Sequence, residues 1–220
     1  MKHIISYIYF DNILQIKNLK ILQNHLENKI FDGNPIETYN IYPFIQYKIL
    51  KHKLFIVALD KYGLTFVDKI INQKITSFIL EKNEQKLEII KLNVCNFYPK
   101  FLNKQISYII DNYIPFRSVS YINFRSLSEN KDKQKEYIAR FLKQHILQFM
   151  HYMDMDLKEF NEKFYLDIIS IEEKKTRLLY KTMLKPFFIK FKTNLLLPNY
   201  IGLGRLNKLG FGNIKLIEQY

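Results

Sequence analysis

A glycine-rich segment near the C-terminus holds the residues of this 220-residue chain that are best suited to bind phosphate. Four of the six glycines fall between residues 202 and 212, and Arg205 and Lys208 lie among them. Glycine permits positive φ angles and a close approach of the backbone to a partner, and N–H groups in such a loop can cradle an anion. The segment therefore predicts phosphate contact. A flexible hairpin connection is the alternative, because Gly-x-Gly alone is a weak signal.

The five histidines are the second group that could do chemistry. His25 falls on a predicted helix, where Asn24 and Glu27 beside it favour an exposed position. His145 lies on the apolar stripe of a long predicted helix and is expected at the edge of a core. No set of His, Cys, Asp and Glu residues has the spacing of metal ligands, and no phosphate loop of nucleotide hydrolases is present. We therefore expect neither a metal nor another cofactor.

The charge balance favours an anionic partner. Lys and Arg number 34 against 21 Asp and Glu, which gives a formal net charge of +13. A basic surface suits nucleic acid or an anionic membrane. Cys95 is the only cysteine, so no internal disulfide can form, and the apolar run over residues 4–10 is too short to span a membrane. The composition predicts a cytoplasmic protein.

The first half of the chain has the pattern of a ferredoxin-like domain over residues 1–95. Strands are predicted over residues 2–10, 42–50, 54–59, 75–80 and 87–92, and helices over 17–30 and 64–72. The last two strands are expected to form a hairpin around the polar turn at residues 82–85. The order is β-α-β-β-α-β with one extra strand, which is typical of that fold.

The second half, residues 96–220, shows a related pattern. A strand over residues 106–114 is followed by an irregular stretch that carries Arg117 and Arg125, and then by a long amphipathic helix over residues 132–153. A hairpin is predicted from strands 164–171 and 176–180, with a charged tip at residues 172–175. A strand over residues 187–192 has one apolar face and one largely basic face with Lys190 and Lys192. The glycine-rich segment then replaces a second helix before a last strand, so we predict an α+β protein of two tandem ferredoxin-like domains.

Two separated motifs resemble a known family. One is the glycine-rich sequence Leu197-Pro198-Asn199-Tyr200-Ile201-Gly202-Leu203-Gly204-Arg205 with Leu209-Gly210-Phe211-Gly212-Asn213-Ile214. The other is the strand Tyr42-Pro43-Phe44-Ile45-Gln46-Tyr47-Lys48. Together they resemble the C-terminal signature and the Tyr-Pro-Leu-Ile-Gln-Tyr-Lys strand of the CRISPR repeat-processing endoribonucleases, the sixth Cas family of the RAMP superfamily. The resemblance spans nearly the whole chain.

The resemblance implies binding and metal-independent cleavage of the repeat in precursor crRNA. A ribose 2′-hydroxyl attacks the adjacent phosphate and leaves a 2′,3′-cyclic phosphate. Such a reaction needs a general base, a general acid and positive charge near the phosphate oxygens. The branch with the Tyr-Pro-Leu-Ile-Gln-Tyr-Lys strand usually carries histidines, often as His-Asn-His, in the loop before that strand. Here the loop at residues 34–41 has none.

Four residues replace those histidines as catalytic candidates by their position. Tyr39 lies in the altered loop, Tyr47 and Lys48 lie on the strand beside it, and His25 lies on the first helix, whose neighbourhood lines the active site in relatives. Three of them have an ordinary structural explanation: Tyr47 would be a core or sheet aromatic, Lys48 a solvated strand lysine and His25 a surface histidine.

The expected RNA contacts lie in the second domain. They are Gly202, Gly204, Arg205, Lys208, Gly210 and Gly212 of the glycine-rich segment, Lys190 and Lys192 of the preceding strand, and Arg117 and Arg125, which stand near aromatic residues. A non-cleaving repeat-binding protein is one alternative, and a basic module that binds an acidic protein or a membrane is another. Whether the chain forms a homodimer or joins a CRISPR interference complex is left open by the sequence.

Overall fold

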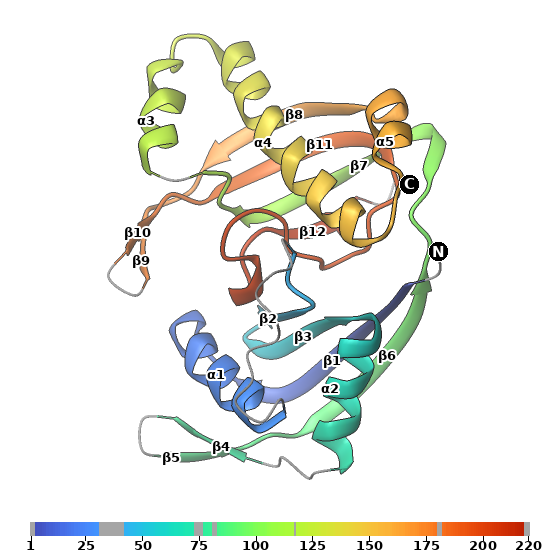
Figure 1. Cartoon of the computed structure of the whole chain (residues 1–220). Coiled ribbons are helices and arrows are strands. Elements are labelled where there is room, and N and C mark those ends of the chain that lie inside the picture. Colours follow the sequence, from blue (N-terminus) through green and yellow to red (C-terminus); the bar gives the residue numbers. More distant parts are fainter. Residues whose placement is uncertain are drawn as a thin grey trace. The chain divides into compact units, whose positions relative to one another are not determined.

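The computed structural model describes residues 3–30, 42–72, 77–80, 83–116, 118–179 and 182–217, and Figure 1 shows them. Two compact units make up the chain. Unit 1 contains Met1–Tyr98 and Lys208–Gly210, and unit 2 contains Pro99–Asn207 and Phe211–Tyr220. The short segment Lys208–Gly210, in the middle of the glycine-rich sequence, thus belongs to the N-terminal unit.

Unit 1 is a four-stranded antiparallel sheet with two helices on one face. The strands are β1 (His3–Ile13), β2 (Ile45–Leu50), β3 (Lys53–Leu59) and β6 (Ile89–Phe97), in the order β2-β3-β1-β6. The helices are α1 (Leu19–Ile30), preceded by the 3-10 turn η1 (Ile16–Asn18), and α2 (Asp60–Asn72). A separate hairpin of β4 (Ser77–Leu80) and β5 (Asn83–Lys86) precedes β6. This strand order is that of a ferredoxin-like domain.

Buried apolar side chains of α1 and a close backbone approach at a glycine of α2 hold the two helices of unit 1 on the sheet. The predicted stripe of α1 is buried, with Leu19, Leu22, Leu26 and Ile30 all fully covered. Gly63 of α2 lies so close to β3 that an added Cβ would be 2.7 Å from the carbonyl carbon of Ala58. Only glycine permits that approach.

Unit 2 repeats the topology around a second antiparallel sheet. Its strands are β7 (Phe101–Tyr113), β8 (Leu166–Glu173), β11 (Phe187–Leu195) and β12 (Asn213–Leu216), in the order β12-β7-β11-β8. Three helices connect β7 to β8: α3 (Ser118–Ser126), α4 (Lys131–Tyr152) and α5 (Leu157–Lys163). A small hairpin of β9 (Arg177–Leu179) and β10 (Thr182–Leu184) precedes β11. Between β11 and β12 only the 3-10 turn η2 (Asn207–Leu209) is helical, as the sequence predicts.

The long helix α4 covers the sheet of unit 2 (Figure 1) and begins and packs as its sequence predicts. The Asn130 side chain caps the helix by accepting a hydrogen bond of 2.9 Å from the Lys133 backbone N–H. Its apolar stripe is fully buried at Ile138, Leu142, Ile146, Phe149 and Met150. The strand β11 beneath it alternates strictly between buried and half-buried residues, which confirms its two-faced pattern.

Three local predictions are wrong. A polar turn between two long strands is predicted at residues 82–85, but residues 83–86 form β5 and pair with β4. The strands around residues 172–175 do not form a hairpin: Glu172 and Glu173 belong to β8, which pairs with β11, while β9 pairs with β10. The stretch with Arg125 is not irregular but forms α3.

The remaining predictions about organisation concern membranes, metals and domains. Among the described residues no helix is both long and apolar enough to cross a membrane. Over the same residues no group of three or more His, Cys, Asp or Glu side chains could hold a metal ion. The boundary between independently folding domains at residues 95 and 96 stays a prediction.

Candidate functional site

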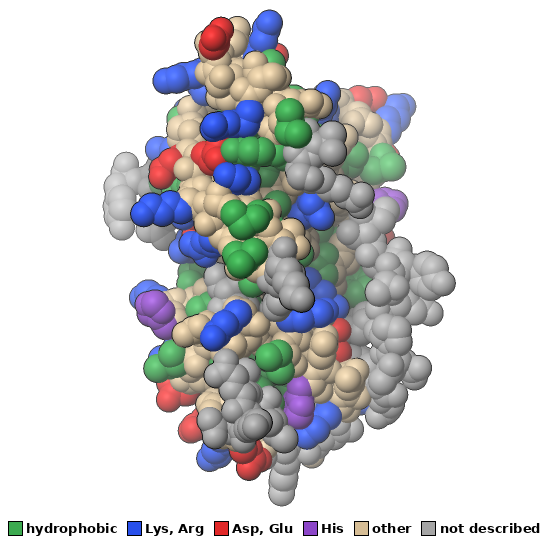
Figure 2. Space-filling view, turned by 90° about the vertical axis from the view of Figure 1, so that its left-hand side faces the viewer, with side chains coloured by type: hydrophobic (Ala, Val, Ile, Leu, Met, Phe, Trp, Pro, Cys, Tyr) green, Lys and Arg blue, Asp and Glu red, His purple; other side chains and the backbone are tan. Residues whose placement is uncertain are grey.

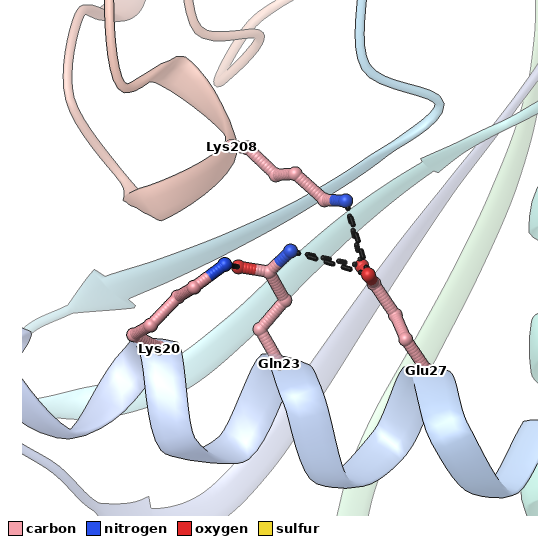
Figure 3. Close-up of polar contacts among 4 residues, drawn as sticks. All are labelled: Lys20, Gln23, Glu27 and Lys208. Carbon is pink, nitrogen blue, oxygen red and sulfur yellow. Dashed lines mark hydrogen bonds and ion pairs between the residues drawn. The ribbon is translucent and has the colours of Figure 1, made fainter. Parts of the chain in front are cut away.

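A polar network on α1 joins the N-terminal helix to the glycine-rich sequence within unit 1 (Figure 3). The Glu27 carboxylate pairs with the Lys208 ammonium at 3.0 Å and accepts hydrogen bonds of 3.2 and 3.3 Å from the Gln23 amide. Lys20 donates in turn to the Gln23 carbonyl at 3.4 Å. Spacings of three and four residues place the three α1 side chains in one row. The network orders Lys208, an expected RNA contact, against helix α1.

Tyr47 of β2 is buried near Glu27 of this network. Its side chain is fully buried, its ring meets the ring of Phe66 edge-on at 6.2 Å, and its hydroxyl has no hydrogen-bond partner among the described residues. Burial, and next the nearby Glu27 carboxylate, raise the pKa of Tyr47 well above its ordinary value. A tyrosine in this state keeps its proton, so it can donate a hydrogen bond but cannot act as a base.

Lys48 points to the opposite face of the sheet from Tyr47, because successive strand residues alternate. In the register of β2 and β3, Lys48 is paired with Phe55 and Tyr47 with Ile56. Lys48 is only 1% exposed, so its interpretation as a solvated strand lysine is wrong. Burial holds the pKa of its amine well below the ordinary value. The structure therefore does not bring the two adjacent candidates together on one face.

His25 occupies a different side of α1. It stands two residues from both Gln23 and Glu27, which is roughly 200° around the helix axis. It is half-buried rather than a freely exposed histidine, and its Nε2 lies 3.2 Å from the carbonyl oxygen of Ser77 in β4. Burial first and the nearby Lys29 ammonium second lower the pKa of His25. If Nε2–H donates to Ser77, then Nδ1 keeps a lone pair that can accept a proton.

Two predicted site residues lie outside the described residues. They are Tyr39, with the rest of the loop at residues 34–41, and Arg117. Their roles stay predictions.

The glycine-rich segment is held by backbone hydrogen bonds, not left as a loose connection. The Leu203 N–H donates to the Gly212 carbonyl at 2.9 Å. A Cβ on Gly212, whose φ is +69°, would lie 1.8 Å from the Leu203 carbonyl oxygen. Gly204, with a φ of +86°, similarly leaves room for the ring of Tyr113, which a Cβ would approach to 2.7 Å. Packing within the chain is thus sufficient to explain why these two positions are glycine.

The other two glycines have comparable local roles. Gly202 forms an isolated β-bridge with Asn213 of β12. Gly210 has a φ of +83° and lies against β2, where a Cβ would be 3.1 Å from the Tyr47 carbonyl oxygen. Gly210 therefore brings the glycine-rich sequence directly against the strand that carries Tyr47 and Lys48.

The predicted cationic contacts of unit 2 differ in their surroundings. Arg205 is exposed, whereas Lys190 and Lys192 are half-buried side chains on the same face of β11. Arg125 is exposed on α3, 3.6 Å from the Glu173 carboxylate, and that carboxylate also accepts a hydrogen bond of 2.6 Å from Tyr121. Arg125 and the Tyr121 hydroxyl thus share one acidic neighbour, Glu173, and the role of Arg125 in RNA contact stays a prediction.

Sequence reasoning missed one partly buried pair beside the glycine-rich segment. The Tyr113 hydroxyl lies 2.7 Å from Nδ1 of His145, and the Tyr113 ring packs against Gly204. Burial, with a smaller effect of the Arg205 charge, lowers the pKa of His145 to about 4. The two residues are 32 positions apart, so no local pattern could have joined them. Glu27 was missed for the same reason, since its partner Lys208 is distant in sequence.

Comparison with known proteins identifies the family. Residues 100–217 match the family model of the Cas6b C-terminal domain, which is more than half of the chain. The chain belongs to the Cas6b family.

Solved structures of Cas6b share this fold over almost the whole chain. One described as a crystal structure of Cas6b has a TM-score of 0.76 at 18% identity, and it covers 99% of this chain and 100% of that chain. A second, described as the CRISPR RNA processing endoribonuclease Cas6b, has a TM-score of 0.75 at 19% identity with the same coverage. An uncharacterized protein of Methanocaldococcus jannaschii is 25% identical over 150 residues, which cover 64% of this chain and 97% of that protein. The tandem ferredoxin-like fold is thereby confirmed.

Proposed function

We propose that this Cas6b-family chain is an endoribonuclease that binds CRISPR repeat RNA and processes precursor crRNA without a metal ion. Membership of the Cas6b family is the observation that carries the proposal. A structural neighbour described as a CRISPR RNA processing endoribonuclease supports it through the shared fold of both units. The formal net charge of +13 suits a polyanionic substrate.

In the proposed reaction the 2′-oxygen upstream of the scissile phosphate forms a bond to phosphorus while the bond to the 5′-oxygen breaks. A base removes the 2′-hydroxyl proton and an acid protonates the leaving 5′-oxygen. The products are a 2′,3′-cyclic phosphate and a 5′-hydroxyl. No redox partner or cofactor is consumed, and DNA cannot react because it lacks the attacking hydroxyl.

His25 suits the role of general base. Its lowered pKa leaves the ring neutral at pH 7, and a hydrogen bond from Nε2–H to the Ser77 carbonyl would fix the tautomer with a free lone pair on Nδ1. Tyr39, in the loop before β2, is proposed as a partner in proton transfer because of its position.

Lys48 and Tyr47 fit the proposed reaction in different ways. Burial lowers the pKa of Lys48 and so makes its amine easier to deprotonate, which suits the role of an acid or base. Tyr47 stays protonated and suits a hydrogen-bond donor. Both side chains are buried, and Gly210 lies against the backbone of both residues, where a Cβ would be 3.1 Å from the Tyr47 carbonyl oxygen and 3.2 Å from the Lys48 Cα.

Substrate binding is proposed to rest on the basic residues of the second half of the chain. Arg205 and Lys208 in the glycine-rich segment, and Lys190 and Lys192 on β11, would pair with phosphates. Arg117 and Arg125 would combine charge with base stacking. Each neutralised phosphate adds to the salt dependence of binding.

A non-cleaving repeat-binding protein is the second candidate. The loop at residues 34–41 has no histidine, and the two strand candidates Tyr47 and Lys48 are buried on opposite faces of the sheet. A protein that had lost its acid–base residues would keep the fold and the basic residues.

Paired substrates separate the two candidates. Repeat RNA and the same RNA with a single deoxyribose upstream of the scissile phosphate are compared for binding and for cleavage. The endoribonuclease is expected to bind both equally and to cut only the first. Tight binding of both RNAs with no cleavage at any protein concentration would favour the non-cleaving protein, and no binding of either would contradict both.

A further inference from the structure

An apolar pocket in unit 2 lies between helix α3, the β9–β10 hairpin and the glycine-rich segment. It has a volume of about 500 Å³. Phe116, Tyr121, Leu179 and Leu184 form its apolar wall, and Lys185 and Arg205 are its two cationic lining residues. Because all these residues belong to unit 2, the pocket is a property of that unit alone.

The aromatic wall of the pocket is held in place. The Tyr121 hydroxyl donates a hydrogen bond of 2.6 Å to the Glu173 carboxylate, and the Tyr121 ring lies 6.4 Å from each of the rings of Phe116 and Phe124. Phe124 is buried and anchors α3. A ring fixed at its hydroxyl end and packed beside two other rings is a preorganised stacking platform.

The charges beside this platform are mainly positive. The Lys185 ammonium lies 5.5 Å from the centroid of the Tyr121 ring, and Arg205 lines the pocket from the glycine-rich segment. Glu173 is the acidic neighbour, but its carboxylate is engaged by Tyr121 and stands 3.6 Å from Arg125. The pocket thus combines apolar surface with cations, the combination that a nucleobase with its attached phosphate requires.

The surface around the pocket has the same mixed character. Figure 2 faces this side of the molecule and shows Lys and Arg side chains spread among exposed hydrophobic ones. Leu178 and Met183 of the small hairpin are 70% and 64% exposed, and Ile122 of α3 is 67% exposed. Such a surface suits an unpaired strand, whose bases offer apolar faces and whose backbone offers charge.

We infer that this pocket binds one unstacked nucleotide of single-stranded repeat RNA, with the base on Tyr121 and its phosphate between Lys185 and Arg205. The inference rests on the proposed function and adds a specific subsite to it. The volume lies within the range of small-ligand pockets, about 300 to 1,000 Å³. The two cations favour a nucleotide, which brings a negatively charged phosphate, over an uncharged apolar side chain of a protein partner.

A double-mutant cycle between protein and RNA tests this inference. The full chain is titrated with repeat RNA that carries a deoxyribose at the scissile position and one abasic site, which is moved along the strand. In the unsubstituted protein, one position or two adjacent ones should weaken binding roughly tenfold. In Tyr121→Ala, the same abasic sites should cost less than about twofold, because the stacking partner is already gone.

Matched variants control for indirect effects. Ile122→Ala removes the neighbouring exposed side chain and should keep the abasic effect, as should Tyr121→Phe, which retains the ring. If Tyr121→Ala lowers thermal stability, Thr182→Trp fills the pocket from its rim and should abolish the effect in the same way. An abasic effect of unchanged size in both Tyr121→Ala and Thr182→Trp would overturn the inference while repeat binding stands. Failure of the unsubstituted protein to bind the repeat would overturn the proposed function, and this inference with it.

Discussion

At the scale of single residues, His25 gives the proposed reaction its clearest pH signature. A base acts only when unprotonated, and burial lowers the pKa of His25 below its ordinary value of 6.5. The cleavage rate should therefore rise with pH through that lowered pKa and level off about one pH unit above it, so that no His25-dependent increase remains above about pH 7.5.

Substitution of His25 supplies the measurement. His25→Ala should lower single-turnover cleavage by about 10² to 10⁴-fold and remove the acidic limb of the pH profile, while repeat binding is unchanged. His151→Ala, at the end of α4, is the matched control and should leave both intact. An unchanged rate for His25→Ala would exclude it as the base.

His145 predicts a pH dependence of stability, not of catalysis. Its pKa is about 4 in the folded chain, below the ordinary 6.5, so the unfolded chain binds its proton more tightly. The associated stability is complete above about pH 6.5 and is lost progressively as the pH falls toward 4. Urea unfolding should show a loss of about 2 kcal/mol from this residue between pH 7 and pH 5.

The control for this prediction is His145→Gln, which cannot gain the proton. It should be less stable than the natural chain at pH 7, because the contact with the Tyr113 hydroxyl is altered. Its stability should decline less steeply between pH 7 and pH 5. Equal slopes for both proteins would show that other groups set the acid sensitivity.

Residue-level roles were only partly predictable from the sequence. The spacing of α4 places His145 at the edge of the core, as found, but its partner Tyr113 comes from a different element. Lys48 has a lysine's usual preference for water, yet the fold buries it completely. Burial of a charged strand residue depends on what covers the sheet, and no local pattern of side chains reveals that.

At the scale of elements, Gly212 and Gly210 allow a matched test of how the glycine-rich segment is built. Both have positive φ angles, so alanine is strained at either position. Only at Gly212 does a Cβ also collide with backbone, 1.8 Å from the Leu203 carbonyl oxygen; at Gly210 the nearest atom is 3.1 Å away.

Gly210→Ala should therefore cost about 1 kcal/mol of unfolding free energy and Gly212→Ala about 3 kcal/mol. Denaturant titration of the two variants measures the difference. Equal losses would mean that the backbone around Leu203 adjusts freely, and the segment would then be less rigid than its hydrogen bonds indicate.

Elements were predicted better than their pairings. The buried strands β1, β3 and β11 and the helices α1 and α4 follow from strong periodicity, because period and burial are encoded locally. The predicted hairpins around residues 82–85 and 172–175 were wrong because strand pairing depends on contacts across the sheet and not only on neighbouring sequence. For example, β8 pairs with β11, although the β9–β10 hairpin lies between them in the chain. Helix α3 was missed because its apolar residues lack a regular stripe.

At the scale of the whole molecule, the charge of +13 should make repeat binding strongly salt-dependent. The logarithm of the affinity for single-stranded RNA should fall by about 0.7 per neutralised phosphate for each unit of log salt concentration. Arg205→Ala should reduce that slope by about 0.7. Lys163→Ala removes the same charge from α5, where Lys163 pairs with Glu159 at 3.0 Å, and should leave the slope unchanged.

If Arg205→Ala and Lys163→Ala reduce the slope equally, then the overall charge, and not the glycine-rich segment, sets the affinity.

The family and the fold of both units could be predicted from two motifs in the right order. The path of RNA could not, because it depends on which basic side chains the two units present together.

The most direct test of the central claim is the chemical identity of the cleavage product. The purified chain is incubated with its repeat RNA in excess EDTA, and the fragment ends are determined by mass spectrometry. We predict cleavage at one position, with a 2′,3′-cyclic phosphate on the upstream fragment and a 5′-hydroxyl on the downstream fragment. Intact RNA under conditions of saturated binding, or fragments with a 5′-phosphate, would contradict the proposed metal-independent endoribonuclease.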